Sequence, residues 1–156
     1  MPSKSSTAVG READTASAIA QFENLRVEFE TRDGTVVGVE DVSFHINPGE
    51  TVCVVGETGS GKSVSSLSMM RLVEFGGGRV AGGQLIFDRA KGGKINVANA
   101  DQSLMRSIRG NEIGMIFQEP MTALNPVMTI GDQIDEIFRF HVSMLPEERQ
   151  KRALSL

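Results

Sequence analysis

The sequence has little cysteine, no long apolar stretch and no large excess of either charge. Its single cysteine, Cys53, excludes a framework of disulfide bonds within the chain, which agrees with a reducing cytosol. No apolar run approaches the roughly 20 residues that a membrane-spanning helix needs, so the chain itself is predicted to be soluble. Lys and Arg number 16, Asp and Glu number 20, and the net charge of −4 argues against nucleic acid as the main partner.

The length of 156 residues is enough for one domain with one hydrophobic core. Residues 1–20 are rich in Ser, Thr and Ala and have no hydrophobic periodicity, so we expect a disordered tail there. Residues 21–156 combine strand-like and helix-like patterns, which predicts an α/β domain without an internal repeat.

Alternating apolar side chains predict two half-buried strands, at Leu25–Phe29 and Val42–Ile46, with a hairpin turn at Asp33-Gly34. Shorter strands are expected at Leu85–Phe87 and Ile95–Val97. Apolar side chains at helical spacing predict four helices: from Lys62 to the glycine run 76–78, over 101–109, over 130–141 with Thr129 as its N-cap, and from Pro146 onward.

Two apolar runs lack alternation and predict strands that are covered on both faces. They are Thr51–Val55 and Ile113–Phe117. Cys53 lies inside the first run, so we expect a small buried side chain there rather than a reactive thiol.

A complete phosphate-binding motif, G-x-x-x-x-G-K-[ST], follows the first of these runs. It consists of Gly56, Glu57, Thr58, Gly59, Ser60, Gly61, Lys62 and Ser63. Its glycines let backbone N–H groups approach phosphate oxygens, and the helix that follows adds a positive partial charge. Lys62 supplies a full positive charge to the β- and γ-phosphates, and Ser63 offers a hydroxyl oxygen to Mg²⁺. The sequence therefore predicts a site for a nucleoside triphosphate with magnesium; a plain glycine-rich turn is the structural alternative.

A second segment narrows the class of phosphate-loop protein. Residues 115–126 read Met-Ile-Phe-Gln-Glu-Pro-Met-Thr-Ala-Leu-Asn-Pro, and Gln118 ends the apolar run. This segment resembles the Q-loop of ATP-binding cassette (ABC) transporter ATPases. Its extension is similar to the branch that imports di- and oligopeptides and glutathione. The resemblance covers residues 22–156 and implies the phosphate-loop NTPase fold of an ABC nucleotide-binding domain.

The resemblance also implies roles for single residues. Phe29 stands where the family places the aromatic ring that stacks on adenine, and a core position in its strand is the alternative. Gln118 would reach Mg²⁺ and the attacking water. This makes Gln118 and Lys62 the catalytic candidates, and Ser63 and Gln118 the metal ligands, at a site that binds ATP. Residues 119–126 would form part of the groove that receives the permease.

The partners implied by the resemblance are transmembrane permease subunits, bound through the Q-loop region, and a second ABC ATPase domain. A periplasmic or lipoprotein substrate-binding protein would take part indirectly. The implied location is cytoplasmic, at the periphery of the inner face of the cell membrane.

Three motifs of the family do not occur in the sequence: the L-S-G-G-Q signature, an apolar strand ending in Asp-Glu (Walker B), and the switch histidine. We therefore expect the N-terminal part of a larger transport ATPase, truncated before the signature and Walker B. Without the groups that act on the transition state, the chain alone is expected to bind ATP but not to hydrolyse it. A stand-alone nucleotide-binding remnant without a transport role is the alternative. A GTPase or kinase is disfavoured, because the sequence has no N-K-x-D or D-x-x-G motif.

Overall fold

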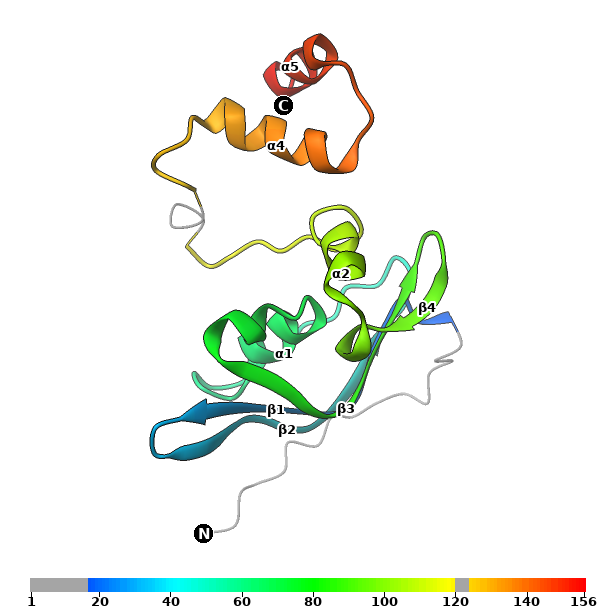
Figure 1. The fold of residues 1–156 in the computed structure, drawn as a ribbon. Helices are drawn as coiled ribbons and strands as arrows, with labels where there is room; N and C mark the ends of the chain where they lie inside the picture. Colours follow the sequence, from blue (N-terminus) through cyan, green and yellow to red (C-terminus); the bar gives the residue numbers. More distant parts are fainter. Residues whose placement is uncertain (1–16, 120–123) are drawn as a thin grey trace. The chain divides into compact units, whose positions relative to one another are not determined.

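The computed structural model describes residues 17–119 and 124–156, and the chain divides into two compact units, Met1–Asp101 and Gln102–Leu156. The first unit contains a β-sheet and the phosphate loop, and the described residues of the second contain the helices α2, α4 and α5 (Figure 1).

Four antiparallel strands form the sheet of the first unit in the order β2-β1-β3-β4. They are β1 (Ala20–Thr31), β2 (Gly34–Ile46), β3 (Gly78–Arg89) and β4 (Gly93–Asn96). Leu25, Val27 and Leu85, which come from the two inner strands, have no exposed surface and form the centre of the core. Both strands predicted from alternation, and both shorter strands, are therefore confirmed as parts of one sheet.

The hairpin between β1 and β2 turns at Arg32 and Asp33, where Thr31 pairs with Gly34. Farther along this pair of strands the register shifts, because Val27 pairs with Val39 whereas Glu28 pairs with Val37. Gly38 is consequently an extra residue in β2, which is a β-bulge.

Helix α1 (Lys62–Met69) begins directly after the phosphate loop, and the short 3-10 turn η2 (Leu72–Gly76) follows it. Figure 1 shows α1 over one face of the sheet, and α1 contacts β1, β2 and β3. Its buried side chains are Ser65, Ser68 and Met69. Gly77 adopts a left-handed conformation with φ of 76° and ends the turn, so the glycine run stops the helical segment as predicted. A second 3-10 turn, η3 (Val97–Asn99), follows β4.

The second unit contains α2 (Gln102–Ile108), α4 (Ile130–His141) and α5 (Pro146–Leu154), which confirms the three helices predicted there. The Thr129 hydroxyl accepts a hydrogen bond from the Asp132 amide at 3.1 Å, so Thr129 is the N-cap of α4. Arg149 of α5 donates to Asp135 of α4 over 2.7 Å, and this ion pair links the two helices.

Both predictions of fully buried strands are wrong. Residues 51–55 form no strand and are exposed, with 90% of the Val55 surface accessible, and Ile116 is 94% exposed. Only Ile113 makes a single bridge, to Arg109. An apolar run becomes a strand when a neighbouring strand accepts its backbone hydrogen bonds, and in the described part of the chain neither run has such a neighbour. Cys53, expected to be buried, is exposed for the same reason.

Part of the predicted tail belongs to the fold. Ala18 is 2% exposed, the Ile19 amide donates to the Ile46 carbonyl at 2.9 Å, and β1 starts at Ala20. The first 16 residues of the expected tail lie outside the described residues. Among the helices in residues 17–119 and 124–156, none has the length and apolar character to cross a bilayer.

Candidate nucleotide-binding site

The phosphate loop joins the exposed segment 51–55, which forms no strand, to the start of α1. Gly59 and Gly61 have φ angles of 84° and 88°, a region that side chains with a Cβ rarely adopt. The Ser60 amide donates to the Glu57 carbonyl at 3.2 Å, which closes the turn of the loop. Gly61 is the N-cap of α1 and has no side chain to cap the helix. The first amide groups of the helix therefore remain directed at the loop, where an anion is favoured.

The Lys62 ammonium folds back over this loop. Its Nζ donates to the carbonyl oxygens of Gly56 at 2.7 Å and Glu57 at 2.6 Å, and lies 3.4 Å from the Ser60 hydroxyl oxygen. The positive charge is thus held over the loop by neutral oxygen atoms. Because an ammonium binds phosphate oxygens more strongly than neutral acceptors, a triphosphate can exchange for these contacts.

Close packing fixes the end of the loop against the sheet. A Cβ added to Gly61 would lie 2.8 Å from the Gly38 carbonyl oxygen and 2.9 Å from Cγ2 of Val39, both in β2. A Cβ added to Gly56 would lie 2.6 Å from the Ser60 hydroxyl oxygen. Glycine is therefore required at position 61 for space as well as for conformation.

The remaining loop residues fit a nucleotide with magnesium. Ser63 begins the exposed face of α1, and its hydroxyl is the type of oxygen ligand that Mg²⁺ accepts alongside phosphates and water. Glu57 and Thr58 are exposed at the variable positions of the motif. The glycine conformations, the open helix start and the Lys62 ammonium all suit a bound phosphate, so the donor set matches the predicted ligand.

Phe29 and Gln118 lie in different units. Phe29 is half-buried near the end of β1, and its ring lies beside Gly38 of β2 and Gly78 of β3. Gln118 is exposed in the segment after α2, which belongs to the second unit. The stacking of Phe29 on adenine and the approach of Gln118 to Mg²⁺ both stay predictions.

An ion-pair network on the sheet was not predicted. Glu28 accepts hydrogen bonds from Arg26 at 2.8 Å in its own strand and from Arg79 of β3 at 2.5 Å. The hydrogen bond from Arg26 is the main cause that holds the pKa of Glu28 below its usual value; desolvation opposes it, and the charges of Arg79 and Arg26 add to the lowering. The alternation in β1 indicates a polar face, but only the strand register places Glu28 opposite Arg79.

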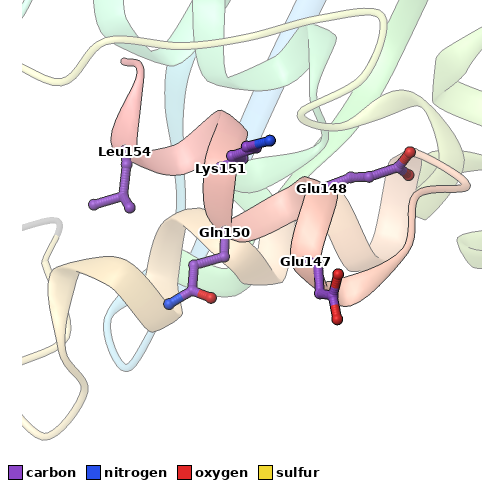
Figure 2. A pocket seen from close by; sticks show the side chains of 5 residues that line it. All are labelled: Glu147, Glu148, Gln150, Lys151 and Leu154. Carbon is purple, nitrogen blue, oxygen red and sulfur yellow. The ribbon is translucent and has the colours of Figure 1, made fainter.

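A hollow of about 260 Å³ lies along α5, lined by Glu147, Glu148, Gln150, Lys151 and Leu154 (Figure 2). All five side chains come from one helix, and Figure 2 shows them spread along its surface. The two carboxylates that line this hollow would repel a triphosphate, and its lining contains a single lysine. The phosphate loop is accordingly the better nucleotide site.

A glycine-rich loop that leads into a helix beside a sheet defines the class of phosphate-loop nucleotide-binding proteins. The family model for ABC transporters matches residues 39–155, and the chain belongs to this family. The predicted fold class, an α/β ABC ATPase domain of which the chain covers part, is confirmed by this match and by solved structures.

Two relatives are similar over nearly the whole chain. A putative peptide import ATP-binding protein of Brucella abortus is 50% identical over 138 residues, which are 88% of this chain and 41% of that protein. The oligopeptide transport ATP-binding protein AppD of Bacillus subtilis is 42% identical over 140 residues, with 90% and 41% covered.

Two further similarities extend the comparison. The glutathione import ATP-binding protein GsiA of Pectobacterium atrosepticum is 44% identical over 88% of this chain and 22% of its own length. The dimeric ATP-binding cassette MJ0796, solved with ADP and Pi, superposes with a TM-score of 0.71 at 25% identity, over 87% of this chain and 54% of that one. The chain thus spans about two fifths or less of the curated relatives described here.

Proposed function

We propose that the chain is the nucleotide-binding part of an ABC importer subunit that couples ATP binding and hydrolysis to the uptake of di- or oligopeptides or glutathione. The chain alone binds Mg-ATP and does not hydrolyse it. The observation that carries the proposal is the phosphate loop, in which the Lys62 ammonium lies beside carbonyl oxygens that phosphates can replace. The names of the relatives supply the substrate class.

Binding at this site begins with the exchange of the Lys62 contacts. The β- and γ-phosphates take the place of the Gly56 and Glu57 carbonyl oxygens as acceptors for Nζ, while the open amides of α1 bind phosphate oxygens. Ser63 and Gln118 would hold Mg²⁺, and Gln118 would orient the attacking water. Magnesium supplies charge neutralisation of the phosphates when it is bound.

Phe29 contributes to binding of the base rather than of the phosphates. Its ring stacks on adenine, and stacking requires only an aromatic face; the residue is half-buried, so part of its surface is accessible. Because β1 and the phosphate loop both contact β2, the proposed binding residues for the base and for the phosphates belong to the same unit.

The partners follow from the importer role. Permease subunits dock on the Q-loop region, of which residues 120–123 lie outside the described residues. A second ABC ATPase domain pairs with this one across the nucleotide, and the substrate-binding protein acts through the permease. The assembly lies on the cytoplasmic face of the membrane.

Mg-ATP binding by the 156-residue chain tests the proposal. Mg-ATP at 100 times its Kd is expected to stabilise the folded chain by about 2.7 kcal/mol, measured as a rise in the melting temperature. The Lys62→Ala variant is expected to lose this shift. Lys91→Ala, which removes the same charge from an exposed turn between β3 and β4, is expected to keep it.

Phosphate release is measured in the same samples and is expected to stay at background. A folded chain whose melting temperature does not respond to Mg-ATP would contradict the binding proposal. Steady turnover that is abolished in Lys62→Ala would contradict the part that assigns no hydrolysis to the chain alone.

A further inference from the structure

Two glycines of the sheet enclose the ring of Phe29. A Cβ added to Gly38 would lie 2.7 Å from Cε2 of the ring, and a Cβ added to Gly78 would lie 2.7 Å from Cε1. Phe29 pairs directly with Gly78 of β3, whereas Gly38 is the bulged residue of β2. The ring therefore spans from one neighbouring strand to the other, and the absence of side chains at both glycines provides the space that it occupies.

Backbone conformation does not explain these two glycines. Neither Gly38 nor Gly78 has a positive φ, whereas nine other glycines of the described residues do. Any residue can adopt the backbone of Gly38 and Gly78, so the contact with the Phe29 ring is the reason that position 38 excludes a side chain. At position 78 the Val73 carbonyl oxygen, 3.0 Å from the added Cβ, contributes as well.

Gly38 also connects the ring to the phosphate loop. Its carbonyl oxygen lies against the Cα of Gly61, where an added Cβ would approach to 2.8 Å. On its other side its Cα faces the Phe29 ring and, at 3.7 Å from the added Cβ, the Val64 side chain of α1. A single residue thus separates the aromatic ring from the start of the phosphate-binding helix.

We propose that Gly38 and Gly78 are positioning residues of the nucleotide site: they seat the Phe29 ring in the orientation in which it binds the base of the nucleotide. The inference rests on the proposed function, because it requires a nucleotide at the loop. A methyl group at either glycine would lie 2.7 Å from the nearest ring atom, so the ring must shift from its position. The base loses its contact, while the phosphates keep theirs.

The ratio of the Kd for Mg-tripolyphosphate to the Kd for Mg-ATP measures the contribution of the base. Both constants are determined by calorimetry on the full chain and its variants Gly38→Ala, Gly78→Ala and Phe29→Ala. Because base stacking on an aromatic ring is worth about 5-fold or more in affinity, we expect each variant to lower the ratio by about that factor. The Kd for Mg-tripolyphosphate is expected to stay unchanged, which a general loss of structure would not allow.

Gly76→Ala is the matched control. Gly76 lies two residues before Gly78, has no positive φ, and an added Cβ would meet nothing within 4 Å. Its ratio is expected to equal that of the wild type. If Gly78→Ala fails to fold, the reason is that its methyl group would also approach the Val73 carbonyl oxygen. Gly38→Ala then still tests the positioning role, since the atoms within 3.5 Å of its added methyl group all belong to the Phe29 ring.

The outcomes separate the two proposals. A wild-type ratio in Gly38→Ala together with a lowered ratio in Phe29→Ala would overturn the seating role of the glycines. An unchanged ratio in Phe29→Ala would overturn it as well, because the ring would then not bind the base. Absence of binding of either ligand to the wild type would instead overturn the proposed function.

Discussion

Gly59 and Gly61 share a backbone conformation but differ in their surroundings, which allows the geometry of the phosphate loop to be tested. Their φ angles are 84° and 88°. A Cβ on Gly59 would meet nothing within 4 Å, whereas a Cβ on Gly61 would lie 2.8 Å from a backbone oxygen and 2.9 Å from a methyl group of β2. Substitution by alanine therefore imposes the same backbone strain at both positions and a steric clash at only one.

The expected magnitudes follow from these two effects. The left-handed conformation costs a residue with a Cβ about 1–2 kcal/mol, and this cost applies to both variants. Overpacking against atoms that cannot move aside costs about 1–3 kcal/mol more. We expect a loss of about 1–2 kcal/mol for Gly59→Ala and about 2–5 kcal/mol for Gly61→Ala. The smaller entropy of the unfolded variants cancels in the comparison, because both replace glycine by alanine.

Urea unfolding of the wild type and the two variants, followed by circular dichroism, gives the free energies of unfolding. Amide hydrogen exchange of α1 then locates the effect, which is expected at the start of the helix in Gly61→Ala. Equal destabilisation by the two substitutions would refute the close packing of the loop on β2.

Two further predictions concern the sheet. Leu25→Ala removes a side chain without exposed surface and is expected to cost about 2–5 kcal/mol in urea unfolding, while Val55→Ala, at a position 90% exposed, is expected to change stability by about 0.5 kcal/mol or less. Equal effects would contradict the assigned core. Arg26 and Arg79 lower the pKa of Glu28 in the folded chain, so its ionised form stabilises the fold above the usual carboxyl pKa of about 4.3. The difference in unfolding free energy between wild type and Glu28→Gln is therefore expected to be present above that pH and to vanish as the pH falls through the lower folded pKa. A pH series of unfolding curves measures this difference. A difference that does not depend on pH would contradict the network.

Local patterns in the sequence were sufficient for most of the elements. Alternation located both long strands, and helical spacing with Thr129 as N-cap located α4, because each pattern reports which side of one element faces the core. The phosphate loop was likewise predictable, since its glycines are required by backbone conformation at Gly59 and Gly61.

The errors arose where the structure depends on a second segment. The runs at 51–55 and 113–117 have strand-like composition, yet a strand also needs a neighbour, which composition does not report. The register that places Arg79 beside Glu28, and the bulge that places Gly38 beside Phe29, are contacts between strands. A single sequence gives no direct signal of such pairing, so the surroundings of Phe29 became visible only in the structure.

The central claim is that residues 56–63 bind the phosphates of a nucleotide, and amide chemical shifts of the isotope-labelled chain test it most directly. On titration with Mg-ATP, we expect saturable shifts of the loop amides and the first turn of α1, with smaller shifts of the same amides on titration with Mg-tripolyphosphate. Lys62→Ala is expected to weaken both responses. Shifts confined to the α5 hollow at residues 147–154, or no saturable shift in a folded sample, would contradict the assignment of the nucleotide site.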